Sequence, residues 1–124
     1  MSLHHVSLEV RPDESDRLAE LFELAGFERV EAPDALGPYV LWLERDGHQI
    51  HLIRSEEPTV MQLGHPALAA PEGRFEEVVA GLRAAGFGVE DHEPLWGAKR
   101  SFAIGPGGLR VEIMEFPPPA ADAG

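Results

Sequence analysis

The stretch LAELFELAGF at residues 18–27 decides the fold, because its closing motif returns later in the chain. Ala25-Gly26-Phe27 recurs as Ala85-Gly86-Phe87, 60 positions on (85 − 25), and a helix-like stretch precedes each copy. Apolar residues at i, i+3, i+4 and i+7 mark both helices: Leu18, Leu21, Phe22 and Ala25, then Phe75, Val78, Val79 and Leu82. Such a repeat predicts two copies of one supersecondary unit.

Strand-like segments surround each predicted helix. One alternating segment precedes each helix and three follow it, at residues 5–10, 27–31, 39–44 and 49–54, then 65–69, 88–92, 100–104 and 109–115. Each helix begins after a proline and ends at a glycine, and Asp46-Gly47 and Gly107-Gly108 mark the last hairpin turns. Each half therefore reads β-α-β-β-β.

The whole chain is expected to form one α+β domain over residues 1–116. Its two βαβββ modules, at about 3–54 and 64–116, would form a cupped mixed β-sheet with the helices outside. Residues 55–63 link the modules, and we expect 117–124 to be a disordered tail. In each strand the apolar residues share one parity and can pack on the helices, so the opposite faces would line a concavity.

Four side chains on the faces away from the helices are candidate metal ligands. His5 and His65 open equivalent strands, 60 residues apart, and His51 and Glu112 lie in equivalent final strands, 61 apart (112 − 51). The difference places a single inserted residue between Gly86 and the turn before Glu112. Packing about a pseudo-twofold axis would bring equivalent positions together. Three imidazoles and one carboxylate suit one divalent ion, Zn, Ni, Co, Fe or Mn.

These motifs resemble the vicinal oxygen chelate superfamily, which includes glyoxalases, epimerases, extradiol dioxygenases and the fosfomycin- and bleomycin-resistance proteins. The resemblance rests on His4-His5-Val6-Ser7-Leu8, on Gly64-His65-Pro66-Ala67-Leu68, and on Val111-Glu112-Ile113 after a Pro-Gly turn. It implies the glyoxalase-like fold, with His5, His65 and Glu112 as metal ligands and His51 where glyoxalases have a carboxylate or amide ligand. It also implies a homodimer.

The donor set favours proton transfer on a small substrate with oxygens on adjacent atoms, as in a lyase, isomerase or epimerase. If His51 binds the ion, two positions remain on a six-coordinate metal, which suits chelation better than extradiol oxygenation. We take His51 and Glu112 as the candidate catalytic residues, because a His51 off the metal would be a suitable base. Trp96 and Arg100 are candidate substrate contacts, and Trp42 fits the core or the cavity equally well.

The composition limits the possible partners. The formal charge is −12, from 22 acidic and 10 basic side chains, which argues against nucleic acid and an anionic membrane surface. With no cysteine and no targeting signal, we expect a cytoplasmic protein. An acidic, non-catalytic drug- or metabolite-binding protein of the bleomycin-resistance type remains the main alternative to an enzyme. An extradiol dioxygenase and a ligand sensor also remain open.

Overall fold

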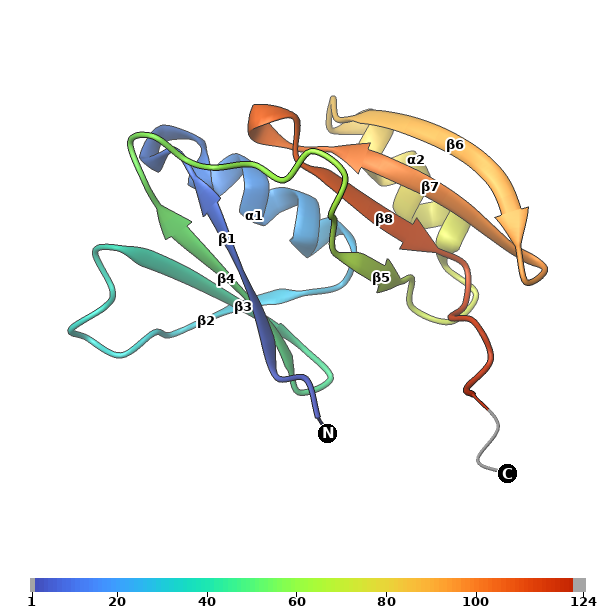
Figure 1. Ribbon diagram of the computed structural model, residues 1–124, viewed down its shortest axis with the longest axis horizontal. Coiled ribbons are helices and arrows are strands. Elements are labelled where there is room, and N and C mark those ends of the chain that lie inside the picture. Colours follow the sequence, from blue (N-terminus) through green and yellow to red (C-terminus); the bar gives the residue numbers. More distant parts are fainter. Residues whose placement is uncertain (1, 122–124) are drawn as a thin grey trace.

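The computed structural model describes residues 2–121 and contains two four-stranded sheets, each with one helix (Figure 1). The first module consists of β1 (His5–Val10), α1 (Ser15–Leu24), β2 (Glu28–Val30), β3 (Val40–Arg45) and β4 (His48–Arg54). The second consists of β5 (Ala67–Ala69), α2 (Phe75–Ala84), β6 (Gly88–Leu95), β7 (Ala98–Ile104) and β8 (Arg110–Met114). Short 3-10 turns, η1 (Pro12–Glu14) and η2 (Pro106–Gly108), precede α1 and β8.

The two sheets repeat one topology. Their strand orders are β1-β4-β3-β2 and β5-β8-β7-β6, with the first pair of each sheet parallel and the others antiparallel. The predicted glyoxalase-like fold is therefore confirmed, with the expected cupped sheet divided in two. The first strand of each module, β1 or β5, is an edge strand that pairs only within its own sheet.

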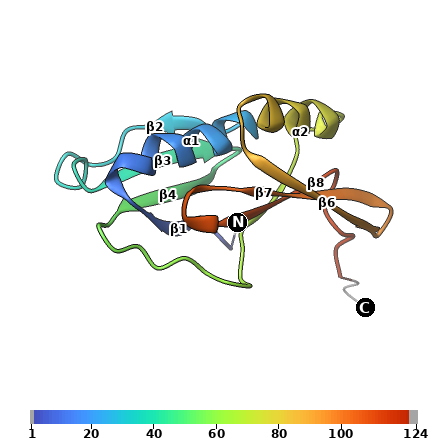
Figure 2. The same cartoon turned by 90° about the horizontal axis from the view of Figure 1, so that it is seen from above.

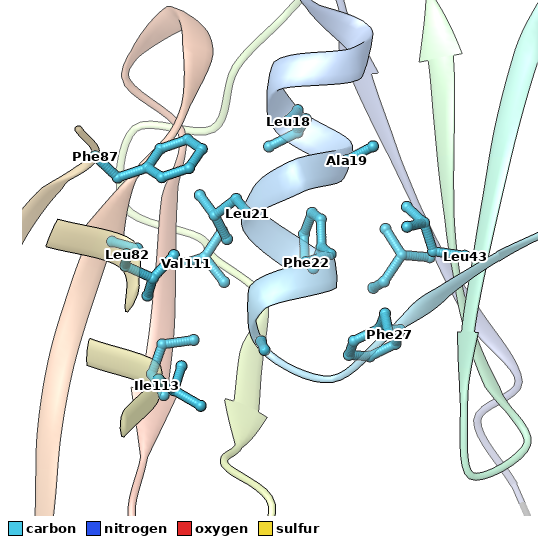
Figure 3. Packing of buried hydrophobic residues seen from close by; sticks show 14 of the residues in the cluster. Leu18, Ala19, Leu21, Phe22, Phe27, Leu43, Leu82, Phe87, Val111 and Ile113 are labelled. Atoms are coloured by element: carbon cyan, nitrogen blue, oxygen red, sulfur yellow. The ribbon is translucent and has the colours of Figure 1, made fainter. Parts of the chain in front are cut away.

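The core is continuous across the modules because α1 packs against both sheets. Both helices lie along one side of the molecule, away from the open faces of the strands (Figure 2). Leu21 of α1 points towards Val111 of β8, whereas Phe22 points towards Leu43 of β3 (Figure 3). Every apolar position predicted for the two helices is buried. This packing leaves the opposite face of each sheet free for polar side chains.

Residues with positive φ angles form several of the turns. Gly26 and Gly86 end the helices at φ 100° and 89°, as glycine after a helix favours. The β6–β7 hairpin was not predicted, because its turn places Trp96, a residue unusual at positive φ, at 41° before Gly97. As a result β6 runs to Leu95, three residues beyond the predicted 88–92.

The inserted residue of the second module lies in the turn that contains η2. Trp42 of β3 pairs with His51, nine positions on (51 − 42), whereas Phe102 of β7 pairs with Glu112, ten positions on (112 − 102). The pairing therefore makes Trp42 equivalent to Phe102 and His51 equivalent to Glu112. The extra residue extends a two-residue hairpin turn into the η2 loop.

Two further expectations concern the ends and the membrane. Residues 117–121 have no regular secondary structure, and residues 122–124 of the expected tail lie outside the described part of the chain. Within residues 2–121, no helix is long and apolar enough to cross a membrane.

Candidate metal centre

The first pair of predicted ligands lies on the open face of the first sheet. The imidazole rings of His5 and His51 are stacked, with centroids 4.1 Å apart and planes at 17°. Trp42 stacks on the other side of His51, also at 4.1 Å and with planes only 3° apart. Trp42, for which core and cavity were both open, therefore lies on the open face of the first sheet, where it packs flat against His51.

Hydrogen bonds fix the tautomer of His51. The amide nitrogen of Gln49 donates to Glu44 Oε1 at 2.9 Å, so the amide oxygen of Gln49 points the other way. That oxygen lies 2.7 Å from His51 Nε2 and can only accept, so Nε2 carries the proton and Nδ1 keeps a lone pair. Burial, and then the nearby His5 and His4, lower the pKa of His51. A neutral imidazole with a free Nδ1 suits metal binding or proton acceptance.

The second pair lies on the open face of the second sheet. His65 Nδ1 is 2.9 Å from the carbonyl of Leu63, which can only accept, so Nδ1 is the protonated nitrogen. His65 Nε2 then faces Glu112 Oε1 at 3.0 Å. At this distance the two atoms share a proton, which a divalent ion bound by both could replace. This pair therefore fits a divalent metal ion as two of its ligands.

Arg100 supports Glu112 from the other side. Its Nε donates to Glu112 Oε2 at 2.9 Å, and its Nη1 donates to the carbonyl of Glu93. Burial raises the pKa of the Glu112 carboxyl, but the hydrogen bonds from Arg100 and His65 and their charges outweigh burial and lower it. Glu112, only 6% exposed, is thus held as a carboxylate with Oε1 directed towards His65.

The two pairs of ligands remain apart within one chain. Among residues 2–121, no group of three His, Asp or Glu side chains is placed to share a metal ion. His5 and His65 both line a cavity of about 500 Å³ between the edge strands β1 and β5. The structure therefore gives each sheet two of the four predicted donors and does not bring the four together.

The remaining candidates have other surroundings. Trp96 lies in the β6–β7 hairpin, where its Nε1 donates to the carbonyl of Phe116. Two side chains that sequence reasoning passed over contact the predicted ligands or their neighbours: Gln49, which binds His51, and Arg110, whose guanidinium lies over Phe102. Gln49 lies on the same strand face as His51, and Arg110 lies on the same strand face as Glu112. This shared face could have identified both residues from the sequence.

The comparison with solved structures decides the fold family. A protein from Bacillus anthracis assigned to the glyoxalase family superposes with a TM-score of 0.77 at 22% identity, over 92% of this chain and 93% of that chain. The chain has a glyoxalase-like fold. The predicted resemblance is thus confirmed at the level of the fold.

Two other glyoxalase-like structures show how varied the chemistry on this fold is. A lactoylglutathione lyase from Agrobacterium tumefaciens matches with a TM-score of 0.67 at 17% identity, over 91% of this chain and 92% of that one. The fosfomycin resistance protein FosX from Listeria monocytogenes matches at 0.72 and 14%, over 92% of both chains. No family model and no curated protein sequence matches the chain. At these identities the likeness describes the fold, and function must be argued from the site.

Proposed function

We propose that this chain is a divalent-metal enzyme that acts on a small substrate with oxygens on adjacent atoms and catalyses proton transfer. The observation that carries the proposal is the His65–Glu112 contact at 3.0 Å, in which a divalent ion could replace the proton shared by Nε2 and Oε1. His5 and His51 offer a second pair of imidazoles at the equivalent place in the other module, and one of these stacked rings would turn to let both bind the ion. Together they form the three-histidine, one-carboxylate set expected for Zn, Ni, Co, Fe or Mn.

The complete site would form between two copies of the chain. Each sheet carries half of the donors, and the edge strands β1 and β5 pair with no strand of the other sheet. A homodimer with twofold symmetry could join His5 and His51 of one copy to His65 and Glu112 of the other, and would do so twice. This arrangement satisfies the donor set without rearranging the shared core around α1.

The side chains have complementary tasks in this proposal. A bound divalent ion would supply Lewis-acid stabilisation of negative charge on the substrate oxygens. His51 is kept neutral, with Nδ1 free to bind the ion or accept a proton. Glu112 is kept ionised by Arg100 and can take the other of these two roles. Trp42 excludes water from one side of His51.

Metal content tests the proposal most directly. Protein purified without an affinity-metal column should contain about one transition-metal ion per chain by elemental analysis. His65→Ala should lose the metal, whereas His48→Ala, which removes an exposed histidine of the β3–β4 hairpin, should keep it. Metal-free protein that also takes up no ion on titration would overturn the enzyme proposal and favour an acidic binding protein.

A mixing experiment tests the shared site. His5→Ala and Glu112→Gln should each fail to bind metal as a pure homodimer. After unfolding and refolding together, a mixed dimer would contain one undamaged site, formed by the intact His5 of one chain and the intact Glu112 of the other. Recovery of metal binding supports a site shared between chains. No recovery, with mixed dimers demonstrated by mass spectrometry, would place all four ligands within one chain.

The reaction itself can then be sought with the metal-loaded protein. Hemithioacetals of 2-oxoaldehydes and epimerisable acyl thioesters test proton transfer, and catechols test the dioxygenase alternative. Turnover of a catechol with oxygen consumption would replace the proton-transfer assignment.

A further inference from the structure

We infer that Arg110 binds an oxyanion of the substrate, so that the ligand of this site is a small anionic molecule such as a carboxylate or phosphonate. The inference rests on the proposed function and adds the substrate class to it. It concerns a residue on the open face of the second sheet, two positions before Glu112 on β8.

The position of Arg110 places it beside the predicted ligands. Its guanidinium carbon lies 4.2 Å from the centre of the Phe102 ring, which is itself buried. His65 meets the same ring edge-on, with centroids 4.9 Å apart. Arg110 and the His65–Glu112 pair are thus both neighbours of Phe102. A short ligand whose adjacent oxygens bind an ion held by His65 and Glu112 could therefore place a further anionic group at Arg110.

The guanidinium of Arg110 has hydrogen-bonding capacity to spare. Its Nε is buried and has no hydrogen-bond partner within residues 2–121. Its Nη2 makes only long contacts of 3.3 Å, to Glu90 Oε2 and to His92 Nε2. The Glu90 side chain is 57% exposed, so this ion pair is weak, and a ligand oxyanion could replace it.

A comparison with Arg100 and Gln49 supports a specific role. Arg100 is on the same sheet, but its Nε and Nη1 already donate to Glu112 and to the Glu93 carbonyl. Gln49 is the position equivalent to Arg110 in the first module, since it pairs with Glu44 as Arg110 pairs with Ile104. A neutral side chain is thus compatible with the fold at this position. The positive charge of Arg110 therefore distinguishes the open face of the second sheet from that of the first, which has neutral Gln49 at the equivalent position.

The charge of the whole chain makes such a residue necessary for an anionic ligand. With a formal charge of −12, the protein repels anions at long range. A guanidinium held against Phe102 has few conformations to lose and can bind two oxygens of a carboxylate or phosphonate at once. It would give local attraction where the overall field opposes binding.

Nuclear magnetic resonance of the metal-free protein tests the inference. The Arg110 Nε–Hε signal, assigned by its loss in Arg110→Gln, is followed during titration with malonate or methylphosphonate, and with neutral malonamide. Arg74→Gln is the matched control, because it removes the same charge from an exposed side chain near α2. Arg110→Lys keeps the charge and loses the planar fork.

The expected result is a saturable downfield shift of Arg110 Hε with both anions and none with malonamide. Affinity should fall about tenfold or more in Arg110→Gln, partly in Arg110→Lys, and less than about twofold in Arg74→Gln, because only Arg110 makes charge-assisted hydrogen bonds to the anion. Absence of a saturable shift in the wild type, or an equal loss in Arg74→Gln, would overturn the inference. The titration uses metal-free protein, so a failure of Arg110 to bind anions would not contradict the metal proposal. In the same way, a failure of the protein to bind metal would not affect the interpretation of the anion titration.

Discussion

The imidazole of His51 lies flat against the indole of Trp42, with the two planes only 3° apart. This contact buries one side of a predicted metal ligand on the open face of a sheet, where a histidine would otherwise be solvated. It also places the ring between Trp42 and His5, so that rotation of His51 is restricted from both sides. The stack restricts the ring of His51 in the metal-free chain, and one of the two imidazoles would have to turn before His5 and His51 could both bind one ion.

Removal of Trp42 should therefore change how His51 titrates. Burial is the largest cause of the lowered pKa of His51, ahead of the charges of His5 and His4. Trp42→Ala would expose the ring, so the pKa of His51 should rise towards its ordinary value in an NMR titration of the histidine ring protons. Trp96→Ala, at the β6–β7 hairpin, is the matched control and should leave it unchanged. Equal pKa values in both variants would contradict the assigned role of Trp42.

Gln49 should control which nitrogen of His51 is protonated. Gln49→Leu removes the only acceptor seen for His51 Nε2 within the described residues, so the proton should distribute between Nε2 and Nδ1. Ring ¹⁵N chemical shifts measure the two tautomers directly. Gln62→Leu makes the same substitution at an exposed position of the linker and should preserve the single tautomer. A single Nε2-protonated form in Gln49→Leu would show that another contact sets the tautomer.

Arg100 should contribute to stability through Glu112. Arg100→Gln would leave a buried carboxylate without its strongest partner, and we expect a loss of about 3 kcal/mol in the free energy of unfolding. Chemical denaturation measures this loss. In a Glu112→Gln background the same substitution should cost much less, because no buried charge is then left unpaired. Additive effects of the two changes would mean that the pair is not coupled.

Acid should weaken the protein partly through Glu112. The pKa of Glu112 is lower in the folded chain than its ordinary value of 4.5, so its stabilising contribution is complete above that value. The contribution is lost as the pH falls through the folded-state pKa. The difference in unfolding free energy between the wild type and Glu112→Gln should therefore be constant at neutral pH and narrow as the pH falls below 4.5. A difference that stays constant as the pH falls below 4.5 would contradict the lowered pKa.

The helices and strands could be predicted from the sequence because each has its own apolar periodicity or turn residues. The apolar positions of α1 and α2, the terminal glycines and the strand parity gave both modules and the faces of all four ligand candidates. Errors occurred where the signal was atypical. Strand β5 begins at Ala67 instead of His65, and β6 was cut short because Trp96 occupies a turn position that usually takes Asn or Gly.

The way in which the two sheets come together at the candidate site could not be predicted from the sequence in the same way. Whether His5 and Glu112 meet depends on how one sheet is placed relative to the other, and periodicity within a strand contains no such information. The contacts that set charge and tautomer, from Gln49 and Arg100, also depend on neighbouring strands. Strand parity predicted the face on which these residues lie, but it did not predict their hydrogen-bond partners.

The two sheets have the same topology, but different side chains occupy the equivalent positions on their open faces. The first carries Trp42, Gln49 and His51, whereas the equivalent positions of the second carry Phe102, Arg110 and Glu112. A molecule held between identical faces could bind in two equivalent ways, related by the pseudo-twofold axis. Between an aromatic, neutral face and a charged one it has a single preferred direction. The divergence of the two halves would thus allow this repeated fold to distinguish one end of a substrate from the other, and one mirror image from its opposite.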